Sequence, residues 1–213
     1  EFANDPRIDA IWFARGGYGS CRIAESVIPR LNATARKKRY LGYSDAGSLL
    51  AGLYKVGFPR RAHGPMASDS VRHDETAAGA VAWLTTGRSD WIEPSLADDP
   101  RPAVAFNLTI VDQLLGTVLE PDLSGHVLML EEVAEAAYRV DRMMFHLTGL
   151  ASIRRVAGIR LGRVSDIPEN DPDFGQTPEE IVRYWCLRSG IAYLGSADIG
   201  HDGANKIVPF GPR

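Results

Sequence analysis

The sequence predicts an α/β protein built around a parallel sheet, and two observations lead to that prediction. Short apolar runs alternate with stretches of helical periodicity, the clearest of them at residues 8–14, 40–43, 126–130 and 156–164. The first run is apolar at almost every position, which is typical of a strand buried in a parallel sheet. The first two runs each end in a glycine-bearing turn that leads into a helix. Because open α/β sheets place their ligands at such turns, we expect the functional site there.

The helices follow from apolar spacing and from their terminal residues. A helix is expected over residues 20–31, and a second over residues 45–56, where leucines and a valine fall on one face. Two more are expected at residues 75–84 and 138–147. Thr177, Pro178 and Glu180 predict the start of another helix, because they combine a capping box with proline at the first helical position.

Composition is that of an ordinary soluble globular protein, with 213 residues, 45% hydrophobic and 24% charged. The formal net charge is -3 and no long basic run occurs, so neither nucleic acid nor an anionic membrane is an expected partner. No apolar stretch approaches the roughly 18 residues of a membrane span. Cys21 and Cys186 are isolated and are expected to be buried thiols in a reducing compartment, which favours a cytoplasmic location. The absence of C-x-x-C and H-E-x-x-H motifs argues against a metal site.

A loop rich in Pro, Asp and Ser at residues 85–102 is the best candidate for a linker. We therefore expect a first domain over residues 1–90, a linker over 91–102 and a second domain over 103–213. The strand at residues 8–14 needs neighbours on both edges, and too few elements precede it. Part of the first domain is thus expected to come from a preceding segment or from another polypeptide.

Ser44 lies at the joint between a predicted strand and a predicted helix. This is the setting of a nucleophile elbow, in which a tight turn exposes the hydroxyl. Gly42 fits that pattern, but Ala46 stands where a second glycine is usual and the glycine comes one place later. An N-cap role for Ser44 is the alternative, and the motif leaves both open.

The other glycine turn reads RGGYG, at residues 15–19. Its spacing fits neither a dinucleotide fingerprint nor a P-loop, so no nucleotide cofactor is expected. The turn exposes backbone amides beside the predicted helix N-terminus. An amide of Gly16 or Gly17, paired with that of Asp45, is a candidate oxyanion hole.

An activated serine needs a base and an acid that orients it. His63 and His201 both lie in glycine-flanked loops and are the two candidates for the base, whereas His146 is expected to pack in the core. The acid is Glu131 or Glu132, since only one of two neighbours on a strand faces the cleft. The residues themselves leave both choices open.

Five motifs, in order and at their separations, resemble the LD-carboxypeptidase family of serine peptidases, whose best-known members are murein tetrapeptide carboxypeptidases. They are RGGYG at 15–19, GYSD at 42–45, HGPM at 63–66, LEEV at 130–133 with YRVDR at 138–142, and GH at 200–201 with Asn205. The resemblance implies a Rossmann-like N-terminal domain, partial here, and a smaller β-rich C-terminal domain. It also implies Ser44 as nucleophile, His201 as base, Glu131 as its orienter, and the amides of Asp45, Gly16 and Gly17 as oxyanion hole.

The reaction implied by the resemblance is hydrolysis of the amide between meso-diaminopimelate and the terminal D-Ala of a murein tetrapeptide, without a cofactor, by a cytoplasmic homodimer. A carboxypeptidase must also hold the free carboxylate of its substrate, for which Arg15 is a candidate, and His63 is a further candidate for substrate binding. Two alternatives remain. One is a relative of the microcin C immunity peptidases, which cleave a peptidyl nucleotide, with Trp91 as a weak indication. The other is a module that binds an anion or a peptide without catalysis.

Overall fold

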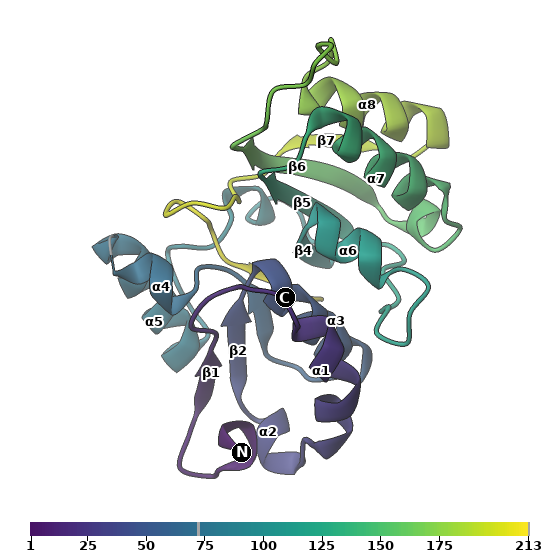
Figure 1. The fold of residues 1–213 in the computed structure, drawn as a ribbon. Coiled ribbons are helices and arrows are strands. Elements are labelled where there is room, and N and C mark those ends of the chain that lie inside the picture. The colour runs from purple at the N-terminus through teal and green to yellow at the C-terminus, as the bar shows by residue number, and fades with distance from the viewer. Residues whose placement is uncertain (72, 213) are drawn as a thin grey trace.

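Two four-stranded sheets organise residues 1–71 and 73–212, which are the residues described by this computed structural model (Figure 1). The first sheet has the order β1-β2-β3-β8. Its strands are β1 (Ala10–Trp12), β2 (Arg39–Gly42), β3 (Arg61–His63) and β8 (Val208–Pro209). The first three are parallel and β8 runs antiparallel to β3. The carboxyl ends of β1 and β2 therefore meet at one edge, as the two glycine turns predict.

The second sheet is parallel throughout and has the order β4-β5-β6-β7. Its strands are β4 (Ala103–Asn107), β5 (Val127–Val133), β6 (Gly158–Ser165) and β7 (Tyr193–Ser196). The predicted α/β class with parallel sheets is thus confirmed. β5 extends beyond the predicted end at residue 130, because Glu132 and Val133 still pair with β6.

Helices cover both sheets (Figure 1). They are α1 (Ser20–Val27), α2 (Ala33–Arg36), α3 (Gly47–Lys55), α4 (Ala67–Ser70), α5 (Asp74–Thr86), α6 (Leu108–Leu114), α7 (Ala137–Gly149) and α8 (Pro178–Ser189). Helices α5 and α3 lie on opposite sides of the first sheet, while α6, α7 and α8 form a row along the second. The capping box of α8 is confirmed, since the Thr177 hydroxyl accepts from the Glu180 amide and the Glu180 carboxylate accepts from the Thr177 amide.

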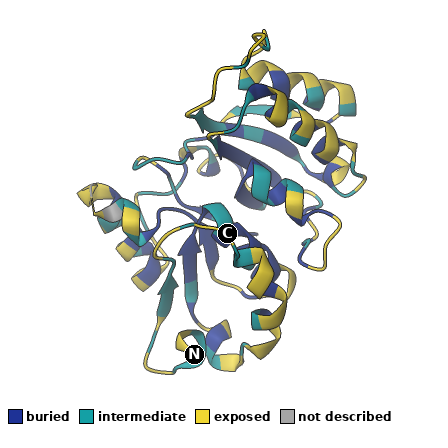
Figure 2. Cartoon of the chain, viewed as in Figure 1, coloured by how far each residue is buried: buried dark blue, intermediate teal, exposed yellow. Residues whose placement is uncertain are grey.

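Strand alternation divides the core around the second sheet. Val104 and Leu128 face the helices, and Ala105 and Met129 face the opposite side. The helix-side core also takes in the residues beneath α3, so it runs continuously from one sheet to the other. In Figure 2 the strands of the second sheet are mostly buried, and the helices that cover them are exposed on their outer surfaces.

The end of the described chain returns to the first sheet. Besides β8, a bridge joins Gly211 to Ala103, and the Phe210 ring packs on Phe106 with centroids 5.1 Å apart. Another bridge joins Ile92, in the expected linker, to Ile207. The division into residues 1–90 and 103–213 stays a prediction, and strand β8 crosses it.

One prediction about the cysteines is wrong. Cys186 is buried, and burial raises the pKa of its thiol to about 12, but Cys21 is exposed on α1. Its helix is amphipathic and Cys21 falls on the outer side. Within residues 1–71 and 73–212, no helix has the length and apolar content needed to cross a bilayer.

Candidate active site

Ser44 occupies a strained turn at the carboxyl end of β2. Its φ is 55°, a left-handed value that costs a non-glycine residue roughly 1–3 kcal/mol and is typical of functional turns. It is the first residue of a short 3-10 helix (Ser44–Ala46) that leads into α3. The N-cap of this turn is Tyr43 and that of α3 is Ala46, so the alternative in which Ser44 is an N-cap is not what the structure has.

The first glycine turn lies directly against Ser44. A Cβ added at Gly16 would stand 2.9 Å from Ser44 Oγ, closer than real Cβ atoms approach, and 3.1 Å from the Ser44 Cβ, which is also a tight contact. Gly17 has φ 124°, which other residues rarely adopt. On the other side, a Cβ at Gly42 would stand 2.7 Å from the Phe13 ring. Glycines at these positions therefore allow the two turns to meet at the serine.

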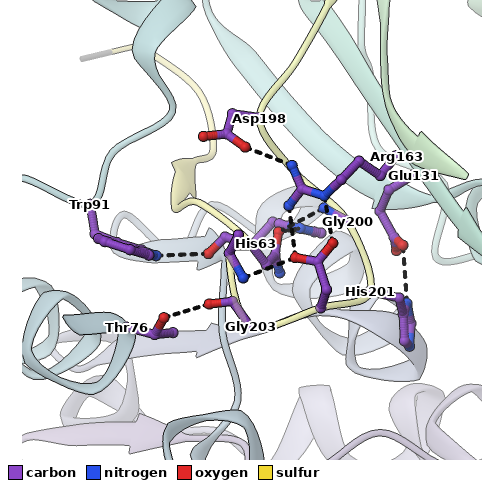
Figure 3. Close-up of polar contacts among 12 residues, drawn as sticks. His63, Thr76, Trp91, Glu131, Arg163, Asp198, Gly200, His201 and Gly203 are labelled. Atoms are coloured by element: carbon purple, nitrogen blue, oxygen red, sulfur yellow. Dashed lines mark hydrogen bonds and ion pairs between the residues drawn. The ribbon is translucent and has the colours of Figure 1, made fainter. Parts of the chain in front are cut away.

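His201 is held by Glu131. The His201 Nδ1 lies 3.0 Å from Glu131 Oε2 (Figure 3), and the carboxylate is fully buried at the carboxyl end of β5. With Nδ1 donating to Glu131, Nε2 is the nitrogen through which His201 can exchange a proton. Burial lowers the pKa of His201, but the hydrogen bond and charge of Glu131 outweigh it and leave the pKa above its ordinary value. For the Glu131 carboxyl group burial acts in the opposite direction and raises the pKa.

Tyr43 connects the serine turn to both candidate histidines. Its ring centroid lies 4.7 Å from that of His201 and 5.5 Å from that of His63. Burial, aided by the negative charges of Asp69 and Glu131, raises the pKa of the phenol, which stays neutral. Because Tyr43 immediately precedes Ser44, the His201 ring packs against the residue next to Ser44 in the chain.

His63 has a different partner. It ends β3, is 1% exposed, and its Nε2 lies 3.1 Å from Asn205 Oδ1. Burial lowers its pKa to about 4, so the ring is neutral near pH 7. Of the two histidines that the sequence leaves open, His201 is the one paired with a carboxylate.

Arg163 forms ion pairs with the loop that carries His201, on both sides of that histidine. Its Nη1 lies 2.6 Å from Asp198 Oδ1, and its Nε and Nη2 lie 2.5 and 2.9 Å from the Asp202 oxygens (Figure 3). The pairing of β5 with β6 has an irregular register opposite Glu131, and this irregularity directs the Arg163 side chain toward the loop. Gly162 allows the loop to pack closely against β6, because a Cβ at that position would stand only 2.6 Å from the Ile199 carbonyl oxygen.

The loop is also held by a bond within itself and by bonds to the first half of the chain. Within the loop, Asn205 Oδ1 accepts from the Gly200 amide at 3.2 Å. From the first half of the chain, the indole of Trp91 donates to the Asn205 carbonyl at 3.0 Å. The Thr76 hydroxyl donates to the Gly203 carbonyl at 2.5 Å (Figure 3). Trp91 thus supports the loop. Arg163 and Thr76 carry no local sequence signal that predicts these contacts.

Glu132 anchors the second sheet to α6. Its Oε1 accepts from the Asn107 side chain at 2.7 Å, and its Oε2 accepts from the Thr109 amide and hydroxyl at 2.8 and 2.7 Å. The two glutamates point to opposite sides of β5, as strand alternation requires. Glu131 is therefore the one that faces His201.

Arg15 is exposed at the start of the RGGYG turn, next to Gly16. Asp45 follows Ser44 and lines a small cavity of about 90 Å³ together with Cys21 and Ser48. In the part of the chain that the structure describes, no three His, Cys, Asp or Glu side chains are grouped as metal ligands would be.

Two family models match this chain: the LD-carboxypeptidase N-terminal domain over residues 1–64, and the LD-carboxypeptidase C-terminal domain over residues 102–213. The fold and these matches define a peptidase of the α/β class. A Synechocystis sp. protein named as a carboxypeptidase is 33% identical over 98% of this chain and 70% of its own length. The chain belongs to the LD-carboxypeptidase family.

Named relatives include the murein tetrapeptide carboxypeptidase of Pseudomonas aeruginosa, 24% identical over 97% of this chain and 71% of that protein. Among solved structures, a muramoyltetrapeptide carboxypeptidase from Oxalobacter formigenes matches with TM-score 0.77 and 26% identity, over 98% of this chain and 74% of the other. MccF in complex with glutamyl sulfamoyl guanosine matches with TM-score 0.73 and 18% identity, over 100% of this chain and 78% of the other. The MccF match shows a shared fold.

Proposed function

We propose that the protein is a serine LD-carboxypeptidase that hydrolyses the amide bond between meso-diaminopimelate and the terminal D-Ala of murein tetrapeptides, in cytoplasmic cell-wall recycling. The observation that carries the proposal is the hydrogen bond from His201 to the buried Glu131, together with the packing of the same imidazole against Tyr43, the residue that precedes the strained Ser44. The substrate class is supported by the names of the relatives from Pseudomonas aeruginosa and Oxalobacter formigenes.

In the proposed reaction, His201 Nε2 takes the proton of Ser44 Oγ, and the serine attacks the amide carbonyl. Glu131 stabilises the imidazolium that forms. The amides of Asp45 and of Gly16 or Gly17 hold the oxyanion, each worth on the order of 3 kcal/mol in the transition state. The imidazolium then gives its proton to the nitrogen of the departing D-Ala. A water molecule, deprotonated by the same imidazole, attacks the acyl-serine, and the imidazolium returns that proton to Ser44 Oγ as the shortened peptide leaves.

Arg15 is the proposed ligand of the free substrate carboxylate. It is exposed and precedes the glycine that touches Ser44, so its guanidinium can serve a group bound beside the serine. His63 is buried and bonded to Asn205, which favours a supporting role for it, through the His201 loop, over direct substrate contact.

The decisive experiment measures D-Ala release from purified murein tetrapeptide by an assay coupled to D-amino-acid oxidase. We expect release by the unaltered protein, none above background by Ser44→Ala, and unchanged release by Ser26→Ala, a serine exposed on α1. Peptide binding without release by the unaltered protein would instead identify a binding module. Cleavage of an aminoacyl sulfamoyl adenosine but not of tetrapeptide would identify an immunity-type peptidase. Analytical ultracentrifugation tests the proposed homodimer.

A further inference from the structure

A second pocket lies at the opposite end of the first sheet from Ser44. It has a volume of about 500 Å³ and is lined by arginines at positions 39, 60, 61 and 88, with Trp83 beside them. Arg39 begins β2, whereas Ser44 follows its carboxyl end. Four residues lie between Arg39 and Ser44, and the five steps of extended chain that join them span roughly 16 Å. The pocket is therefore distinct from the candidate active site.

The positive charges in this pocket are not balanced by carboxylates. Among residues 1–71 and 73–212, none of the four arginines forms an ion pair, and the pocket lining includes no Asp or Glu. Two of them are held by neutral carbonyl groups: Arg39 donates to Thr85 at 3.1 Å and Arg60 donates to Lys37 at 2.8 Å. These bonds fix the guanidinium groups but leave their charge uncompensated.

Arg61 is the clearest case of a positive charge without a carboxylate partner, because this residue is only 5% exposed. Its Nη atoms donate to the carbonyls of Phe58 and Phe210, and its Nε has no partner in the described structure. The Tyr54 ring covers one face of the guanidinium, 4.1 Å from centroid to Cζ. Burial lowers the pKa of Arg61 to about 10, which still leaves it charged near pH 7. A buried cation without an anion is unfavourable, so a bound anion would stabilise this arrangement.

We propose that this pocket, called here the arginine pocket, binds the phosphate group of a small phosphorylated ligand. Guanidinium groups match phosphate oxygens in pairs, and several converging charges favour a dianion over a single carboxylate. Trp83 supplies an apolar wall beside the charges for the rest of the ligand. The site is separate from the peptidase reaction and needs no property of Ser44.

The test is isothermal titration calorimetry with inorganic phosphate at constant ionic strength, and with acetate as the carboxylate probe. We expect saturable phosphate binding that is at least tenfold tighter than acetate binding. The double variant Arg60→Gln/Arg88→Gln removes two exposed guanidinium groups and should weaken phosphate binding about tenfold or more. Arg188→Gln, exposed on α8, is the matched control and should bind as the unaltered protein does.

Two further arms separate this site from the peptidase site and identify the ligand. Ser44→Ala should keep full phosphate affinity while it loses peptidase activity. Glycerol 3-phosphate binding more tightly than phosphate would identify an organic phosphate, and equal affinity would identify free phosphate; either supports the arginine pocket. No saturable phosphate binding, or an unchanged affinity in a double variant with native circular dichroism, overturns the proposal.

Discussion

The His201 Nδ1 and the Glu131 Oε2 lie 3.0 Å apart, and the carboxylate of that pair is fully buried. The pair joins the last loop of the described chain to the centre of the second sheet, so the two residues meet only when β5 and the loop are both in place. The bond fixes the imidazole tautomer and raises the pKa of His201. Both effects can be tested by replacing the carboxylate.

Glu131→Gln should lower kcat by about 10³–10⁴-fold, because a neutral amide neither stabilises the imidazolium nor selects the tautomer. A general base acts when it is neutral, so with His201 as the proposed base the activity should fall as pH drops through the pKa of His201. Loss of Glu131 removes the interaction that raises this pKa, and the acidic limb of the kcat/KM profile should move to lower pH. An acidic limb that stays in place would show that Glu131 does not act on His201.

His63 should make the fold sensitive to acid. Its pKa is lowered from 6.5 to about 4 by burial, so the stability it contributes is present above pH 6.5 and is lost as pH falls toward 4. The full difference corresponds to about 3 kcal/mol of unfolding free energy. Urea unfolding at several pH values should show this loss, and His63→Gln should flatten it. His73→Gln, at an exposed histidine, should leave the pH dependence unchanged.

Local sequence patterns predict much of this fold, because apolar periodicity and capping are properties of neighbouring residues. The start of α8 at Thr177 and the turn at Ser44 follow from such patterns. The choice between His63 and His201 does not, because the sequence predicts a glycine-flanked loop for both, whereas in the structure His63 is the last residue of β3. It depends on which loop reaches Glu131, and that is set by the pairing of distant strands.

Packing between elements that are distant in the sequence also accounts for the wrong prediction for His146 and for the absence of a prediction for Arg163. His146 was expected in the core, yet its side chain is 49% exposed and its Nδ1 bonds to Asp112 at 2.7 Å. Helix α7 turns that position outward, and a short apolar run does not show which side of a helix is covered. Arg163 was missed because its role arises from an irregularity in β6 that only the paired sheet reveals.

Arg163→Lys should reduce kcat/KM about a hundredfold with little change in overall stability. Lysine keeps the charge but cannot bond to Asp198 and to both Asp202 oxygens together, so the loop that carries His201 loses its fixed position. Peptidase assays and thermal unfolding measure the two effects separately. Arg183→Lys, which changes an exposed pair with Glu179 on α8, is the control and should alter neither. Equal activity in the two variants would contradict a positioning role for Arg163.

Gly16→Ala should abolish most activity while the protein still folds. The new methyl group would stand 2.9 Å from Ser44 Oγ, so either the serine rotamer or the RGGYG turn must shift. Either shift separates Ser44, the proposed nucleophile, from the proposed oxyanion amides, and a displacement of about 1 Å can cost about a hundredfold in rate. Gly149→Ala is the matched control, since a Cβ there meets nothing within 4 Å. Kinetics and thermal unfolding of the two variants give the comparison, and a fully active Gly16→Ala would show that this turn does not form the oxyanion hole.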